Sequence, residues 1–216
     1  GVAPPEGPQR AERVVAEVNR LRALFGPRRR VIDFGCGDGR IAALLAPHAE
    51  ALVAYDLSPF MRAEAAQNLS AFPHAVVRST DGRTIDAPTA SADLIVVLHV
   101  LETLPVAVVA AVVAEVARAL ALEGRAVLHL AADDADARER RALHSAPGAA
   151  SAAAFADPAA VAAFLSAHGL AVVVLEREGV AWRVVSARAA LGAARPTAAD
   201  CRGSSIPSPG TCPDGT

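Results

Sequence analysis

The residues best suited to do chemistry gather in one glycine-rich stretch. The stretch VIDFGCGDGR, residues 31–40, places three glycines at alternate positions directly after a short apolar run. Glycine adopts positive φ without strain and allows a ligand to come close to the backbone. A helix that begins after such a loop offers free N–H groups to a polar or anionic ligand. The stretch therefore predicts a loop that binds a small ligand at the start of a helix.

Two classes of nucleotide ligand compete for this loop. The dinucleotide fingerprint is G-x-G-x-x-G/A, in which the last small residue lets helix and strand pack around a pyrophosphate. Gly35 and Gly37 match its first two positions, but Arg40 stands at the third. Asp56 follows Gly35 by 21 residues, where a carboxylate can accept hydrogen bonds from both hydroxyls of a ribose. The alternative role for Asp56 is that of a helix-capping or turn residue, but Ser58 can already cap the helix that follows. The pattern favours a nucleoside ligand without a pyrophosphate.

The elements that must position these residues alternate along the chain. Apolar patterning predicts strands over 31–34, 51–55, 75–78, 92–98 and 125–130, and helices over 9–25, 40–46, 58–69, 106–120 and 158–167. Such alternation is typical of a parallel, doubly wound sheet whose carboxyl edge carries the ligand loops. Two further strands, 170–178 and 180–188, are separated only by Gly179, so they should form an antiparallel hairpin. We expect a Rossmann-like α/β fold with a mostly parallel seven-stranded sheet and this hairpin at its C-terminal end.

The chain is expected to form one domain. Residues 9–191 should make up that domain, with a lid insertion over 131–156 that contains a helix near 136–144. Residues 1–8 and 192–216 are rich in proline, glycine and small polar residues, and we expect both segments to be flexible.

Composition excludes several function classes. The net charge is −2 and the chain has no lysine, which excludes Schiff-base chemistry and a P-loop lysine. No basic stripe suggests nucleic acid as a partner, and no apolar run approaches the roughly 20 residues of a membrane span. The three cysteines, Cys36, Cys201 and Cys212, form no disulfide framework or zinc motif by spacing. We expect a cytoplasmic protein; its oligomeric state is not predicted.

A metal site is also not expected from the sequence. Three aspartates follow the strand over 125–130, at Asp133, Asp134 and Asp136. They are more typical of a solvated run of charge at the start of the lid, and we assign no metal to them.

Three segments taken in order resemble a known family. VIDFGCGDGR, VAYDLSPFMRAEA and STDGRTIDAPTASADLIVVLHVLETL are similar to successive motifs of class I S-adenosylmethionine (SAM)-dependent methyltransferases. The resemblance covers about 31–130, with a weaker match over 169–186. It implies SAM as the methyl donor, S-adenosylhomocysteine (SAH) as the product, and a Rossmann sheet that ends in an antiparallel strand.

The resemblance implies roles for residues around the methionine half of the donor. Gly35, Cys36 and Gly37 would pass beneath the methionine moiety, and Asp33 would anchor the loop or the amino group. His99, after the fourth strand, would contact the methionine moiety and face the acceptor.

Other residues would hold the adenosine half. The resemblance implies that Asp56 holds the ribose, with Leu57 against the adenine. Asp81 would accept a hydrogen bond from the adenine amino group, and Gly82 would offer a backbone N–H. For Asp93 we expect structural anchoring.

Methyl transfer from a sulfonium needs a base only when the acceptor arrives protonated. His99 and His129 both lie near carboxyl ends of central strands, and we expect one of them to assist an acceptor O–H; His144 in the lid is a weaker candidate. Many small-molecule members have a histidine where this chain has Thr103, so the family's pattern does not supply the base.

The acceptor is narrowed by elimination. The first helix, the 131–156 insertion and residues 102–104 should form its walls, and their alanine, valine and leucine content favours a small, fairly apolar organic molecule, methylated on O or N, of specialised metabolism. One alternative is a non-methylating member of the same fold that binds SAM or serves as a scaffold partner. Another, a nicotinamide-dependent oxidoreductase, is disfavoured by Arg40 and the hairpin.

Overall fold

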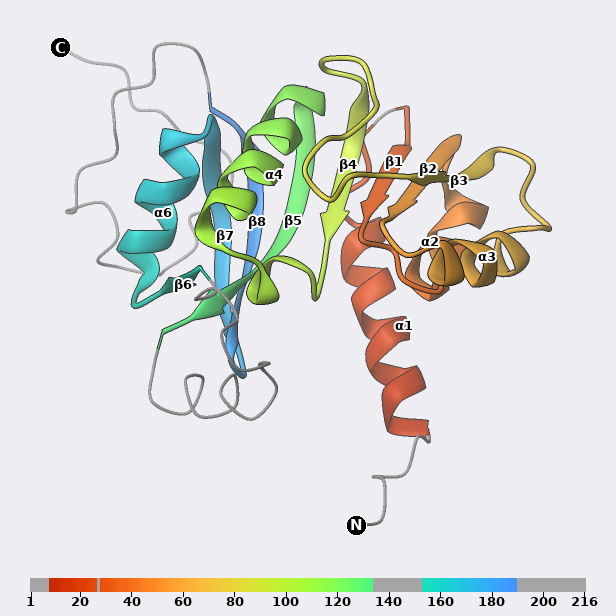
Figure 1. Cartoon of the computed structure of the whole chain (residues 1–216), viewed down its shortest axis with the longest axis horizontal. Coiled ribbons are helices and arrows are strands. Elements are labelled where there is room, and N and C mark those ends of the chain that lie inside the picture. The colour runs from red at the N-terminus through yellow and green to blue at the C-terminus, as the bar shows by residue number, and fades with distance from the viewer. Residues whose placement is uncertain (1–7, 27, 134–152, 190–216) are drawn as a thin grey trace, which may run out of the picture.

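A mixed, mostly parallel sheet forms the centre of the molecule (Figure 1). The computed structural model describes residues 8–26, 28–133 and 153–189. The strand order is β3-β2-β1-β4-β5-β8-β7, and β6 pairs with β5 beside this path. The strands are β1 (Arg30–Phe34), β2 (Ala51–Asp56), β3 (Ala75–Ser79), β4 (Ala92–Val97), β5 (Leu120–Ala132), β6 (Ala154–Phe155), β7 (Leu170–Glu178) and β8 (Ala181–Arg188).

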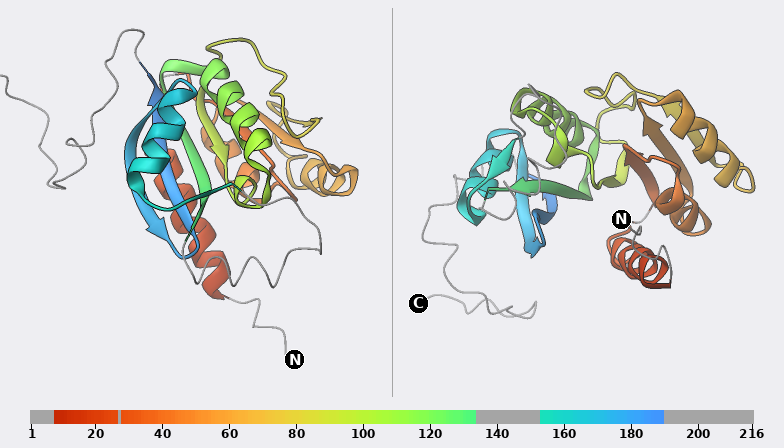
Figure 2. Two further views of the ribbon diagram at one scale, coloured as in Figure 1. Left: turned by 60° about the vertical axis from the view of Figure 1, so that its left-hand side comes forward. Right: turned by 60° about the horizontal axis from the view of Figure 1, so that its bottom comes forward.

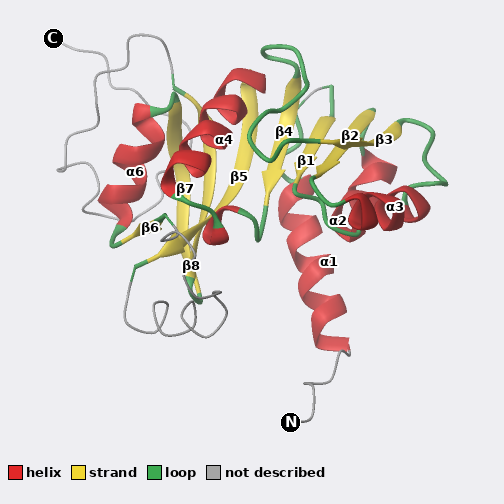
Figure 3. Ribbon diagram, in the orientation of Figure 1, coloured by secondary structure: helices red, strands yellow, loops and turns green. Residues whose placement is uncertain are grey.

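Helices cover both faces of the sheet (Figures 2 and 3). They are α1 (Pro8–Arg22), α2 (Arg40–Leu45), α3 (Pro59–Asn68), α4 (Val106–Ala119) and α6 (Pro158–Ala167), with 3-10 turns η1 (Ala46–His48) and η2 (Leu101–Thr103).

Successive residues of the central strands face different hydrophobic clusters. In β4, Ile95 and Val97 belong to the cluster that includes α4 and α6, whereas Leu94 and Val96 belong to the one that includes α1, α2 and α3. Because side chains alternate across a strand, a strand covered on both faces must be apolar throughout. All six residues of β4 are buried, as its continuous apolar sequence predicts.

The predicted fold class is confirmed. β1, β2, β3, β4 and β5 pair in parallel, and β7 and β8 pair antiparallel on either side of Gly179. Among the described residues, no helix is long and apolar enough to cross a membrane.

Several boundaries differ from the prediction. α1 ends at Arg22 rather than 25, because Leu24 and Phe25 form tighter turns toward Gly26. β5 begins at Leu120, directly after α4, since that residue pairs with Ala92. β6 was not expected, because a two-residue strand has no periodicity to read. Several predicted segments lie outside the described residues: most of the expected lid (134–152) with its helix near 136–144, the entry segment except residue 8, and the C-terminal tail (192–216). The predicted domain boundaries therefore stay predictions.

Asp93 anchors the start of the sheet. Its buried carboxylate accepts a hydrogen bond from the Arg30 backbone N–H at 3.0 Å and contacts the Arg30 Nε at 3.2 Å. These contacts agree with the structural role expected for Asp93.

Candidate ligand-binding cleft

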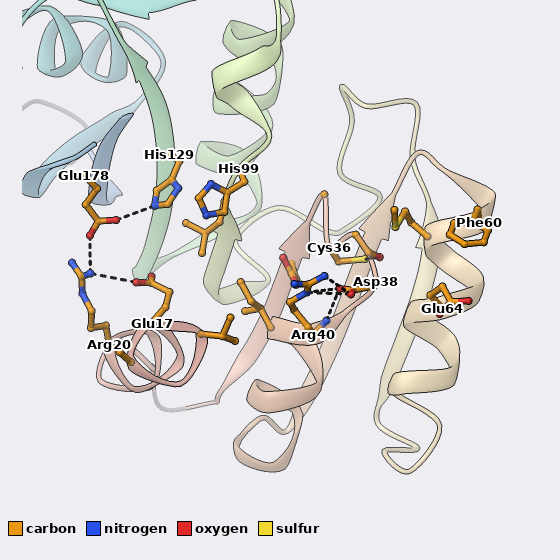
Figure 4. A pocket seen from close by; sticks show the side chains of 18 residues that line it. Glu17, Arg20, Cys36, Asp38, Arg40, Phe60, Glu64, His99, His129 and Glu178 are labelled. Carbon is orange, nitrogen blue, oxygen red and sulfur yellow. Dashed lines mark hydrogen bonds and ion pairs between the residues drawn. The ribbon is translucent and has the colours of Figure 1, made fainter. Parts of the chain in front are cut away.

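A cleft of about 1090 Å³ opens beside the carboxyl ends of β1 and β4 (Figure 4). Its walls come from the β1–α2 loop, from α1 and the start of α3, and from the ends of β4, β5 and β7. Ligand pockets typically measure roughly 300–1,000 Å³. The cleft is therefore large enough for a nucleoside and a second small molecule together.

The three glycines of the loop differ in how much space a side chain would have at each position. Gly35 has φ +78°, and a Cβ there would lie 2.2 Å from a Val100 methyl carbon. Gly39 has φ +76°, and its Cβ would lie 2.9 Å from the Ala65 Cβ, so it allows α2 and α3 to pack closely. A Cβ on Gly37 would meet no atom of the described residues within 4 Å. Packing thus explains two of the glycines, whereas Gly37 leaves open space in the cleft.

Asp56 holds the glycine loop in place. One carboxylate oxygen accepts a hydrogen bond from the Gly37 N–H at 2.9 Å, and the other accepts one from the Ser58 N–H at 2.8 Å. Ser58 caps α3 by accepting a hydrogen bond from the Met61 N–H. Asp56 therefore ties the end of β2 to the loop, in addition to any contact with a ligand.

Asp33 has the most unusual environment in the cleft. Its side chain is buried, and Oδ2 has no hydrogen-bond partner among the described residues. Burial, and to a lesser extent the charge of Asp56, raises the pKa of Asp33 to about 7. A buried polar atom without a partner is costly, so this carboxyl is suited to receive a cationic group of a ligand.

Cys36 is not placed for nucleophilic chemistry. Burial, followed by the charges of Asp33 and Asp56, raises the pKa of its thiol. The thiol lies 3.5 Å from the Gly37 carbonyl oxygen. Because only the thiolate is a strong nucleophile, Cys36 serves as a small neutral side chain that lines the cleft.

Asp81 and Gly82 lie apart from the described lining of this cleft, as does the largely exposed Leu57. Asp81 accepts hydrogen bonds from the backbone N–H groups of Arg83 and Thr84 and from the Thr84 hydroxyl. These bonds, led by the one from Arg83, lower the pKa of Asp81. Oδ1 accepts all three of these hydrogen bonds and so stabilises the turn at 81–84, which leaves Oδ2 as the oxygen that could accept a hydrogen bond from a ligand.

The structure brings the two predicted histidines together. His99 lies in the turn after β4 and has φ +59°, a conformation that non-glycine residues rarely adopt. Its ring lies edge-to-face against that of His129 on β5, with centroids 4.6 Å apart. Glu102 of η2 places Oε1 3.3 Å from Nδ1 of His99. The hydrogen bond to Glu102 raises the pKa of His99, whereas burial and then the charge of His99 lower the pKa of His129.

An ionic network joins α1 to the hairpin on the side of the cleft that faces away from the glycine loop; Figure 4 shows Glu17, Arg20 and Glu178 of this network. Arg20 donates to Glu178 at 2.7 Å, and the buried Arg183 donates to Glu17 at 3.0 Å. Glu176 also contacts Arg20. The first helix was expected to form a wall of the cleft, but this network was not anticipated.

The structure thus collects most of the predicted site in one place. Six of the predicted residues line the cleft: Asp33, Gly35, Cys36, Gly37, His99 and His129. Sequence reasoning missed Glu17, Arg20 and Glu178. The i,i+3 spacing of Glu17 and Arg20 places both on one helix face, but nothing in the sequence indicates that this face meets the hairpin.

A family model described as a methyltransferase domain matches residues 8–177. No curated protein matches the chain in sequence. Magnesium protoporphyrin IX methyltransferase from Synechocystis PCC 6803, solved with bound SAH, is similar in structure, with a TM-score of 0.64, 20% identity, and coverage of 83% of this chain and 84% of that one. A TehB-like SAM-dependent methyltransferase from Corynebacterium glutamicum has a TM-score of 0.60 and 20% identity, covering 84% and 95%. The mitomycin 7-O-methyltransferase MmcR has a TM-score of 0.65 and 18% identity, covering 85% of this chain and 59% of that one.

Proposed function

The chain belongs to the methyltransferase-domain family, and from this premise we propose that it transfers a methyl group from SAM to a small organic acceptor. The observation that carries the proposal is the buried Oδ2 of Asp33, which has no hydrogen-bond partner in the described part of the chain and lies in the same cleft as the open space at Gly37. SAM carries an α-ammonium group that an ionised Asp33 would bind. The residues present therefore fit this donor.

The other donor contacts are proposed from the sequence resemblance. Gly35, Cys36 and Gly37 would lie beneath the methionine moiety. The adenosine half would extend toward the end of β2, where Asp56 binds the ribose hydroxyls through the lone pairs that the loop leaves free.

Three residues beyond the described lining would complete the adenine site. Leu57 would pack against the ring, the free carboxylate oxygen of Asp81 would accept from the adenine amino group, and Gly82 would offer its N–H. The exposure of Leu57, 65%, supports this role, because a ligand would cover an apolar side chain that water now contacts.

The acceptor would occupy the rest of the cleft, between the donor and α1. His99 and His129 line that part, and we propose that they assist the loss of the proton from an acceptor O–H. The similar structures include methyltransferases named for small molecules, which supports an acceptor of that class for this chain.

Calorimetry tests the donor. We expect SAM and SAH to bind and NADPH not to bind, because the loop lacks the third position of the dinucleotide fingerprint. Asp33→Asn should weaken SAM binding at least tenfold, since an amide oxygen can accept a hydrogen bond from an ammonium group but carries no opposite charge. Asp86→Asn, at an exposed carboxylate outside the cleft, is the matched control and should bind SAM normally. Tight NADPH binding without SAM binding would contradict the proposal.

A labelled-methyl assay tests catalysis. With SAM carrying a labelled methyl group, a small-molecule extract should acquire label only when the wild-type protein is present. His99→Ala and His129→Ala should each lower kcat by roughly 10²-fold or more if the acceptor arrives protonated. If both variants kept full kcat with normal SAM binding, the role given to the histidines would be wrong. SAM binding without label transfer to any extract would favour the alternative of a non-methylating SAM-binding protein.

A further inference from the structure

His129 is buried between two carboxylates and hydrogen-bonds to neither. Its side chain is 6% exposed, and neither ring nitrogen has a hydrogen-bond partner within the described ranges 8–26, 28–133 and 153–189. Glu102 Oε1 lies 3.9 Å from Nδ1, and Glu178 Oε2 lies 3.6 Å from Nε2. A carboxylate oxygen thus faces each nitrogen just beyond hydrogen-bonding distance.

No neutral tautomer of His129 satisfies both neighbours. A neutral imidazole has one N–H and one lone pair, so either tautomer directs a lone pair at a carboxylate oxygen. A cation on the Nδ1 side, with the N–H on Nε2, would satisfy both carboxylates.

Three potential ligand atoms converge on that side. The Nδ1 atoms of both His99 and His129 face the same Glu102 oxygen, at 3.3 and 3.9 Å, and ligand atoms of the three residues lie within 4.8 Å of one another. Metal–ligand bonds of about 2.0–2.2 Å place two ligands of a tetrahedral ion roughly 3.3–3.5 Å apart. A contraction of at most about 1.5 Å between these atoms would therefore complete such a site. The second Glu102 oxygen is also buried without a hydrogen-bond partner among the described residues.

We propose that His99, Glu102 and His129 bind one divalent transition-metal ion, for which zinc is the best match. Two imidazoles and a carboxylate suit zinc better than magnesium or calcium, which prefer oxygen ligands only. The sequence assigned no metal because it offered only the aspartates after β5 for that role. This site uses other residues, which the fold brings together from the turn after β4, from η2 and from β5.

Glu178 completes the arrangement as a positioning residue. With the ion on Nδ1, the ring carries its N–H on Nε2 and directs it to Glu178, a carboxylate–histidine–metal arrangement that fixes the tautomer. Figure 4 shows Glu178 directed at His129 on the side away from His99. The ionic pair with Arg20 in turn holds Glu178 in place.

Three protein ligands leave a fourth position, as in catalytic zinc sites. Both histidines line the cleft, so an acceptor hydroxyl could occupy that position. Coordination lowers the pKa of such a hydroxyl, which would release its proton to water. The acceptor oxygen would then bond to the methyl carbon while the carbon–sulfur bond breaks and sulfur keeps the electron pair. This last step rests on the proposed function, in which the histidines assist through the ion; the binding of the ion does not.

Zinc binding to the chelator-stripped full chain tests the site directly. Competition against a chromogenic zinc chelator should show one site that requires His129 and Glu102. His129→Gln and Glu102→Gln should each weaken zinc binding more than about 100-fold, beyond the 10–100-fold typical of outer-shell changes and expected for Glu178→Gln. His48→Gln, which removes an imidazole outside the cleft lining, is the matched control and should bind zinc like the wild type.

Cobalt offers a second readout that does not depend on activity. Co²⁺ bound to the wild type should give visible absorption bands that are lost or shifted in Glu102→Gln, a variant that keeps the size of the side chain. Absence of zinc binding to the wild type, or wild-type zinc affinity in both folded variants, would overturn the proposal. If His129→Gln does not fold, Glu102→Gln and the cobalt spectrum decide the outcome.

SAH calorimetry in the presence of chelator separates this inference from the proposed function. Zinc binding without SAH binding would support the metal site and contradict the proposal that the chain uses SAM. SAH binding without zinc binding would support the use of SAM and contradict the metal site.

Discussion

Replacing Asp33 by asparagine should make the folded protein more stable at alkaline pH while it impairs donor binding. The pKa of Asp33 is about 7 in the folded chain, against an ordinary value of 3.8. The folded state therefore holds the Asp33 proton more tightly than the unfolded state does. The contribution of Asp33 to stability is complete below pH 3.8 and is lost as the pH rises from there to about 7.

The size of the effect follows from this difference in pKa. Above pH 7, ionisation of Asp33 costs the fold at most about 4 kcal/mol, the free energy that corresponds to raising its pKa from 3.8 to about 7. About 3 kcal/mol of that cost arises between pH 5 and pH 8.5. Asparagine has nearly the same shape and does not titrate. The stability advantage of Asp33→Asn should therefore be about 3 kcal/mol larger at pH 8.5 than at pH 5, or roughly 6–12 °C in Tm for a domain of this size.

Thermal melts of the wild type and the variant at the two pH values measure this change. The quantity compared is the gap in Tm between variant and wild type, measured once at pH 5 and once at pH 8.5. The cost of the buried amide itself is the same at both pH values, so it cancels when the two gaps are subtracted. Asp86→Asn, at an exposed position, should show the same gap at pH 5 and pH 8.5. A pH-independent gap for Asp33→Asn would refute the reasoning, since Asp33 would then ionise as it does in the unfolded chain.

Two further pairs of variants test the loop and the network. Gly35→Ala should destabilise the fold by about 3 kcal/mol, because alanine is strained at φ +78° and its methyl would lie 2.2 Å from a valine methyl. Gly37→Ala should cost only about 1 kcal/mol but weaken SAM binding; normal affinity in calorimetry would show that the donor does not lie over this residue. Arg183→Ala should cost about 3 kcal/mol in urea unfolding, because it removes a buried side chain and leaves Glu17, among the described residues, with only the longer contact to Arg20 at 3.4 Å. Arg78→Ala, which breaks an exposed pair, should cost less than about 1 kcal/mol, and equal losses for the two arginines would contradict this account.

Local patterns were sufficient to predict most of the fold. The continuous apolar run at 92–97 indicated a strand covered on both faces, and a single glycine between two strands required a hairpin. The position of the glycine loop at the sheet edge could also be predicted, because its residues are contiguous and Asp56 follows at the end of the next strand. Each of these inferences depends on residues that are close in sequence.

The contacts around the two histidines of the cleft could not be predicted in the same way. The sequence placed His99 and His129 at the same sheet edge, but the contact between their rings depends on the turn that holds His99 at positive φ. Glu178 reaches His129 only because the hairpin lies antiparallel beside β5 and its outer strand ends at the cleft. Side-chain contacts between distant elements leave no periodic trace in the sequence.

The bridge between α1 and the hairpin also has a consequence for the order of folding. Glu17 and Arg183 are 166 residues apart, whereas Gly37 and Asp56 are 19 apart. Short-range contacts form ahead of long-range ones, because closing a long loop costs more chain entropy. The loop proposed for the donor should therefore take shape while the chain is still being synthesised, and the opposite wall only after residue 183 has emerged. If the loop binds the donor as proposed, a nascent chain would acquire affinity for the donor first and the enclosed space for an acceptor last.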